Sequence, residues 1–159
     1  MGILERLFGN SGSKPVPVDT IHPIFGSIYM DTDSSWFAET SDPFGCKGNP
    51  SLSIDGDDTG PFLASVDTFR QLRDNWTSIA STIAETLLEL NHNYFSDNPD
   101  KQLETADGIW DTAELLSVSV GPDGNASLTY IFDWQLPGDD HQITVYLEKW
   151  NPTGTSIDG

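Results

Sequence analysis

The alternation of apolar and polar residues predicts short β-strands in the first third of the chain. Residues 21–31 (IHPIFGSIYMD) place Ile24, Ile28 and Met30 on one side and Phe25 and Tyr29 on the other, which is the period of a strand. Residues 35–40 (SWFAET) and 51–55 (SLSID) predict two further strands, and the segments between them are rich in Asp, Gly and Pro. We therefore expect an antiparallel meander of three strands.

The middle of the chain predicts one long amphipathic helix. Neither Gly nor Pro occurs in residues 62–98, and Ser65 is a suitable N-cap, with Asp67 in the first turn. Apolar residues recur there at intervals of three or four, which places them on one helical face: Phe69, Leu72, Trp76, Ile79, Ile83, Leu87, Leu90 and Tyr94. This face must cover a sheet or another helix.

Three more alternating segments follow the helix, at residues 113–120, 126–134 and 142–150. The order of elements predicts an α+β domain over residues 21–159. Its antiparallel sheet of about six strands is arranged as three strands, one long helix and three strands, with the helix packed on one face.

Residues 1–20 are expected to lie outside this domain. Residues 1–9 carry an apolar patch at helical spacing, and residues 9–19 are a flexible linker rich in Gly, Ser and Pro. The patch could pack on its own domain, or it could be a peptide that docks on a larger assembly.

The net charge of the chain limits the kinds of molecule that it can bind. Seven Lys and Arg residues stand against 25 Asp and Glu, giving a formal net charge of −18. Such a field repels nucleic acid and anionic membranes and attracts a basic protein or a cation. An organism with a salty cytoplasm would explain the same charge without any partner. With no signal peptide, no transmembrane segment and a single cysteine, Cys46, we expect a cytoplasmic protein.

Residues 53–62 (SIDGDDTGPF) are similar to the start of a calcium loop. Counting from Asp55, Asp57 takes position 3, but position 12 is Val66, which offers no oxygen ligand. A turn between a strand and a helix accounts for the Asp and Gly residues without an ion. We therefore expect no metal and no cofactor.

Catalytic residues are not indicated either. His22, His92 and His141 lie in different predicted elements, with no metal-ligand spacing. Cys46 lies beside Lys47, whose charge favours a thiolate, but no partner base can be assigned. An alternative stays open: a small-molecule-binding or enzymatic domain with a pocket between helix and sheet, and with Cys46 or His141 at its rim.

Two segments carry a family likeness. HPIFGSI at the start of the meander and DWQLPGDDHQITVYLE near the end resemble a group of small uncharacterised bacterial α+β domains, over residues 21–150. Some of these look like immunity proteins encoded beside secreted toxins. The resemblance implies a cytoplasmic protein without enzymatic activity that neutralises a toxin.

Our leading hypothesis is therefore an acidic protein-binding domain, in its sharpest form an immunity or inhibitor protein against a basic toxin. Carboxylates in turns would occupy the cationic site of the toxin, and exposed aromatic rings would supply further contacts. The candidate partner-binding residues are Asp55, Asp57, Asp58, Asp139, Asp140, Trp36 and Phe37.

Overall fold

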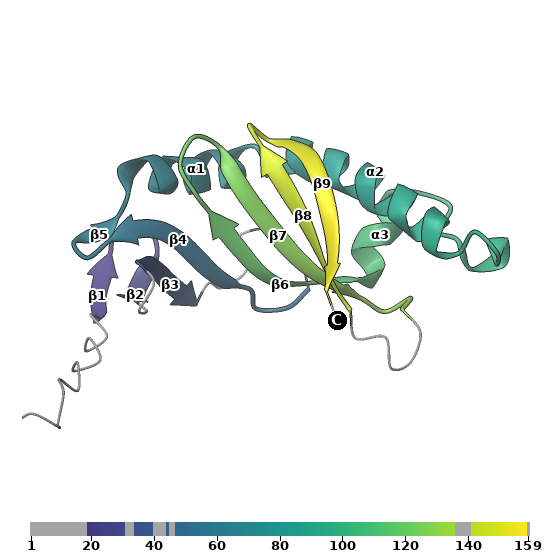
Figure 1. The fold of residues 1–159 in the computed structure, drawn as a ribbon, viewed down its shortest axis with the longest axis horizontal. Helices are drawn as coiled ribbons and strands as arrows, with labels where there is room; N and C mark the ends of the chain where they lie inside the picture. The colour runs from purple at the N-terminus through teal and green to yellow at the C-terminus, as the bar shows by residue number, and fades with distance from the viewer. Residues whose placement is uncertain (1–18, 31–33, 40–43, 45–46, 136–140, 159) are drawn as a thin grey trace, which may run out of the picture.

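The computed structural model describes residues 19–30, 34–39, 44, 47–135 and 141–158. The expected peptide and linker of residues 1–20 therefore lie almost entirely outside the described residues. Over the described part, the elements in chain order are β1 (Asp19–His22), β2 (Gly26–Met30), β3 (Ser35–Glu39), β4 (Ser51–Asp57), β5 (Gly60–Pro61), α1 (Leu63–Asp74), α2 (Trp76–Tyr94), the 3-10 helix η2 (Pro99–Lys101), α3 (Asp107–Thr112), β6 (Ala113–Val120), β7 (Asn125–Phe132), β8 (Gln142–Glu148) and β9 (Asn151–Asp158) (Figure 1).

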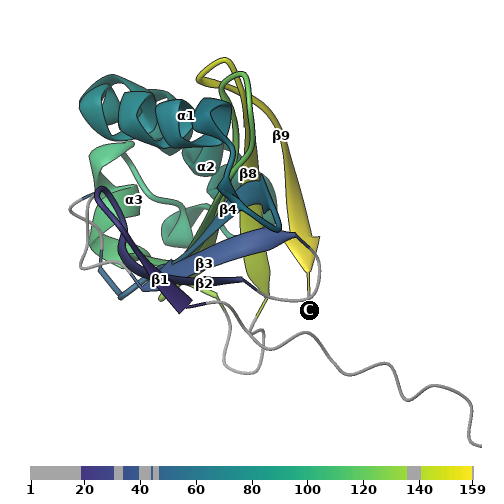
Figure 2. The same ribbon diagram turned by 90° about the vertical axis from the view of Figure 1, so that its left-hand side faces the viewer.

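The fold is α+β, with the sheet and the helices in separate layers. The strands form one sheet in the order β1-β2-β3-β4-β6-β7-β8-β9, and the short β5 pairs with β4. The α-helices lie together on one side of this sheet (Figure 2). The predicted six strands and single helix are wrong, because the described residues form nine strands and three α-helices.

The centre of the sheet is a parallel pair, which corrects the expectation of a purely antiparallel sheet. Strands β4 and β6 run in the same direction, with Leu52 opposite Val118, whereas every other described pair is antiparallel. The helices between them carry the chain back along the sheet, so that the next strand starts at the same end as β4.

Two hairpins account for most of the additional strands. The predicted strand of residues 21–31 is divided at residues 23–25, because Pro23 opens a turn that Gly26 closes with a φ of 73°. At the other end, Lys149 and Trp150 form a two-residue turn with φ values of 48° and 72°, and this turn sends the chain back as β9. Neither Lys nor Trp is a usual residue for such a turn.

The predicted long helix bends at Asn75, which separates α1 from α2. Both the backbone N–H and the side-chain Nδ2 of Asn75 donate to the Gln71 carbonyl, at 3.0 and 2.8 Å. An Asn side chain that competes for a helical carbonyl in this way interrupts the regular ladder. The helix also begins at Leu63, before Ser65, so that Ser65 is a buried residue of the first turn and not the N-cap.

The helices close the core against one face of the sheet. The predicted apolar stripe is buried over most of its length, with Leu72, Ile83 and Leu87 fully covered, but Tyr94 at its end is 36% exposed. The three covered residues belong to one cluster with strand residues that point the same way, including Leu52, Ile54, Val118, Leu128, Tyr130 and Val145. None of the described helices combines the length and the apolar character needed to cross a membrane.

Candidate partner-binding site

The sheet face that points away from the helices is lined by small hydroxyl side chains. Because side chains alternate along a strand, the residues next to the core residues in each strand point outwards. The strand register aligns them in two rows across the sheet. These outward-facing hydroxyl residues of β4, β6, β7, β8 and β9 are Ser51, Ser53, Ser117, Ser119, Ser127, Thr129, Thr144 and Ser156.

A shallow hollow of about 410 Å³ lies on this face, and we call it the trough. Ser119 of β6 and Ser127 of β7 contribute to its floor. Asp55 of β4, Asn125 of β7, and Tyr146 and Glu148 of β8 also line it. The hollow exists because serines stand in the middle of the row, where bulkier side chains would fill the space.

Gly121 leaves room for the Asp55 carboxylate at one end of the trough. A Cβ atom at position 121 would lie only 3.0 Å from Asp55 Oδ2. Asp55 is itself exposed, on the same side of β4 as Asp57. The absence of a side chain at Gly121 therefore lets the carboxylate stand beside the end of β6.

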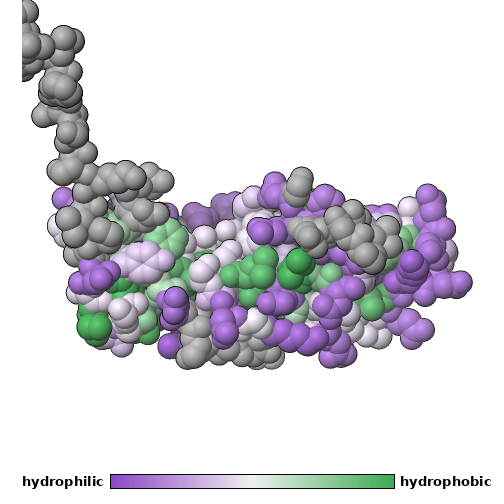
Figure 3. Space-filling view, turned by 90° about the horizontal axis from the view of Figure 1, so that it is seen from below, coloured by the Kyte–Doolittle hydropathy of each residue, from purple (hydrophilic) through white to green (hydrophobic). Residues whose placement is uncertain are grey.

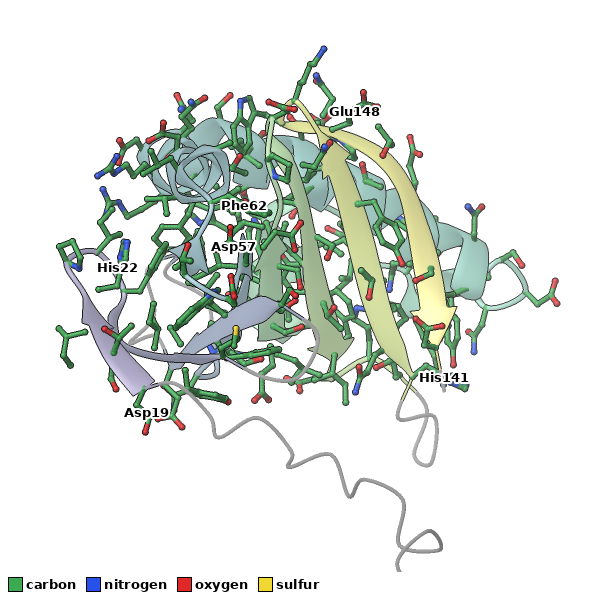
Figure 4. The ribbon with its side chains drawn as sticks, turned by 60° about the vertical axis from the view of Figure 1, so that its left-hand side comes forward. Asp19, His22, Asp57, Phe62, His141 and Glu148 are labelled. Carbon is green, nitrogen blue, oxygen red and sulfur yellow. The ribbon has the colours of Figure 1, made fainter. Side chains whose placement is uncertain are left out.

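The trough is acidic. Asp55 and Glu148 line it, and the described residues around it include neither Lys nor Arg. Figure 4 shows Glu148 at the β8–β9 turn and Asp57 at the end of β4. Carboxylates and an exposed aromatic ring are groups that attract cations.

Asp57 and Asp58 extend the negative charge beyond β4. Asp57 accepts hydrogen bonds from Thr59 Oγ1 at 2.6 Å and from Thr59 N–H at 2.8 Å. These two bonds, the side-chain one first, lower the pKa of Asp57 below its ordinary value. The carboxylate thus stays ionised to a lower pH than a free Asp side chain, while Asp58 is exposed in the same turn.

The aromatic candidates differ in position. Trp36 is only 1% exposed, and its Nε1 donates to the Asp57 carbonyl, so its ring belongs to the core. Phe37 is half-buried on the outer face, where it stacks on Tyr29 with centroids 5.6 Å apart. The register places Phe37 in line with Ser53, and through it with the serines of the trough.

The structure does not describe three of the remaining candidates. Asp139, Asp140 and Cys46 lie outside the described residues. His141 lies at the end of β8 opposite to Glu148 (Figure 4). Sequence reasoning missed Tyr146 and Glu148, although their alternation with the buried Val145 and Leu147 already placed them on the outer face.

The described residues do not form a cluster that could hold a metal ion. In the part of the chain that the structure describes, no three His, Cys, Asp or Glu side chains converge to hold an ion. His92 Nε2 lies 2.8 Å from the Leu103 carbonyl. His22 stacks on Phe25 and accepts from the Ile24 N–H, and burial, followed by the charge of Arg70, lowers its pKa. These two rings bind neighbouring parts of the fold.

Apolar surface lies elsewhere on the molecule. Seen from below, polar side chains predominate at the end formed by α2 and η2, and apolar side chains gather at the β1–β3 end and near the middle (Figure 3). Ile21 of β1 is 78% exposed at that end. The β1–β3 end therefore adds apolar contact area beside the Tyr29–Phe37 pair.

No family model matches the chain, and no significant match was found among curated proteins or among solved structures. The likeness to immunity-like bacterial domains thus stays an expectation from the sequence. Any functional conclusion must come from the geometry of the chain itself.

Proposed function

We propose that this protein is an acidic binding domain whose trough receives a Lys or Arg side chain of a basic protein partner. The observation that carries the proposal is the joint position of Asp55, Glu148 and Tyr146 around one hollow, with no cation among its described lining residues. An exposed aromatic ring beside unpaired carboxylates complements the long apolar stem and charged head of these side chains.

Each part of the trough has a role in this mode of binding. Asp55 on β4 and Glu148 on β8 lie three strands apart, so each attracts a cationic head separately. The 45% exposed Tyr146 ring, on the same strand as Glu148, packs against the stem of the side chain bound there. The hydroxyls of Ser119 and Ser127 offer hydrogen bonds to polar groups of the partner.

The surroundings of the trough extend the contact. Asp57 and Asp58 add negative charge at one end and so increase the rate of encounter with a basic protein. Tyr29 and Phe37, further along the same row on β2 and β3, provide apolar contacts beyond β4.

A sharper form of the proposal is inhibition of a basic toxin. The net charge of −18 and the resemblance of the two sequence segments support this role. The inhibitor would occupy the cationic site of the toxin with its own carboxylates, which requires no catalytic residue of the inhibitor.

Matched charge reversals test whether the trough itself binds. Wild type, Asp55→Lys/Glu148→Lys and Glu85→Lys/Glu89→Lys would be immobilised and exposed to lysate of the native organism at low salt, followed by a salt gradient. Glu85 and Glu89 are exposed on α2, on the helix side of the sheet, so both variants undergo the same change in net charge.

The proposal expects one basic protein that wild type and the α2 variant retain, and that the trough variant loses. The α2 variant should release it at a slightly lower salt concentration, because only long-range attraction has changed. Equal loss of this protein from both variants would mean that its retention depends only on the net charge of the chain. Full retention by the trough variant, or no discrete protein on wild type, would contradict the proposal.

A further inference from the structure

A second hollow lies on the helix side of the sheet, between α2 and α3, and it is separate from the trough. Its volume is about 480 Å³, which is within the range of pockets that hold small molecules. Its described lining includes three aromatic rings, those of Phe44, Trp76 and Trp110. Ala80 and Ala84, one helical turn apart on α2, leave the space between these rings and the helix unfilled.

The aromatic rings are held in place by contacts among themselves. The centroids of Trp76 and Trp110 are 6.1 Å apart with planes inclined at 57°, and Phe44 lies 4.8 Å from Trp76 at 56°. Trp110 also contacts the fully buried Tyr130, at 6.0 Å between centroids. The aromatic wall is therefore fixed by the core before any ligand arrives, which reduces the entropy lost on binding.

The lining carries a single kind of charge. Asp107, at the start of α3, is the one charged residue among the described residues around the hollow. A neutral ligand would cover this carboxylate without pairing it, at a cost in desolvation. A cation would pair with Asp107 and lie against the negative faces of the tryptophan rings.

We infer that this hollow binds a small organic cation of the quaternary ammonium class. A quaternary ammonium has no N–H group, and its positive charge is spread over its apolar methyl groups. It can therefore contact both the aromatic wall and the carboxylate without requiring hydrogen-bond acceptors. The alanines of α2 admit the methyl groups, and Asp107 supplies the counter-charge. This ligand site is independent of the proposed protein-binding trough.

Choline and its uncharged carbon analogue 3,3-dimethylbutan-1-ol provide the direct test, because they have the same shape and differ in charge. Binding would be followed by the upfield shift of the methyl protons, caused by aromatic ring currents, and by tryptophan fluorescence. Choline is expected to bind with a Kd in the millimolar range and at least about fivefold more tightly than the neutral analogue.

Three variants locate the binding. Asp107→Asn should weaken choline binding several-fold, whereas Asp111→Asn, on the same helix but outside the lining, should leave it unchanged. Ala80→Phe adds a ring to the hollow without removing a core contact and should abolish binding in a chain that remains folded.

The inference is overturned if the neutral analogue binds as well as choline, or if the tryptophan fluorescence does not change up to about 100 mM choline. It is equally overturned if Asp107→Asn and Ala80→Phe both leave choline binding unchanged.

Discussion

Leu128 and Ser127 are neighbours in β7, but one faces the helices and the other faces away from them. Leu128 is fully buried in a cluster of aliphatic and aromatic side chains, whereas Ser127 is half-buried in a row of hydroxyl residues. The alternation of a single strand thus supplies apolar packing to one side and a polar, accessible surface to the other. The covered face holds the fold together, and much of the outer face is accessible.

The largest difference between the faces should appear in stability. Leu128→Ala removes a fully buried side chain and is expected to lower the free energy of unfolding by about 3 kcal/mol, within a range of roughly 2–5. Ser127→Ala, one residue away, should change it by less than about 0.5 kcal/mol. Urea denaturation of both variants measures this, and similar losses would mean that the outer face is also structural.

A smaller effect is expected where the outer face is altered without removing a charge. Gly121→Val places a Cβ atom 3.0 Å from Asp55 Oδ2 and pushes that carboxylate out of its position in the trough. Affinity for the basic partner should fall by about fivefold, equivalent to about 1 kcal/mol. Calorimetric titration measures the loss, and Gly108→Val, in α3 on the helix side of the sheet, is the control. An unchanged affinity would exclude Asp55 from the contact.

The smallest effect concerns the ionisation of Asp57. Thr59→Val removes the side-chain donor but keeps the backbone N–H, so the pKa of Asp57 should rise towards its ordinary value. A lowered pKa in the folded chain stabilises the fold above the pKa of the unfolded chain, and this contribution is lost as the pH falls through the folded value. With Thr59→Val the contribution should be smaller at neutral pH.

An NMR titration of the Asp57 carboxyl carbon measures the shift, with Thr155→Val as the control. If the Asp57 titration does not move in Thr59→Val, the Thr59 hydroxyl is not the cause of the lowered pKa.

Many of the strands and the helix face that form the buried core could be predicted from sequence periodicity. Alternation located β3, β6, β7 and β8, and the spacing of three and four located the buried face of α1 and α2. These patterns are strong because each reflects one side exposed to water and one side buried. The same reasoning could not see the break at Asn75, because the apolar spacing continues across it.

Features that depend on turns or on register were missed. β9 is an edge strand of mostly exposed residues, and its turn uses Lys149 and Trp150, so neither its composition nor its turn is typical. The parallel pairing of β4 with β6 joins distant parts of the chain, which no local pattern records. For the same reason Asp55 was proposed as a site residue, but Tyr146 and Glu148 were not placed beside it.

The central claim is that the outer face of the sheet, and not the helix surface, binds the partner. Chemical-shift mapping of the isotope-labelled chain, as the captured basic protein is added, tests it most directly. The account predicts that the perturbed amides cluster at Ser53, Ser119 and Ser127 and along β8, with little change on α1 and α2. Perturbations concentrated on the exposed sides of α1 and α2 would contradict it.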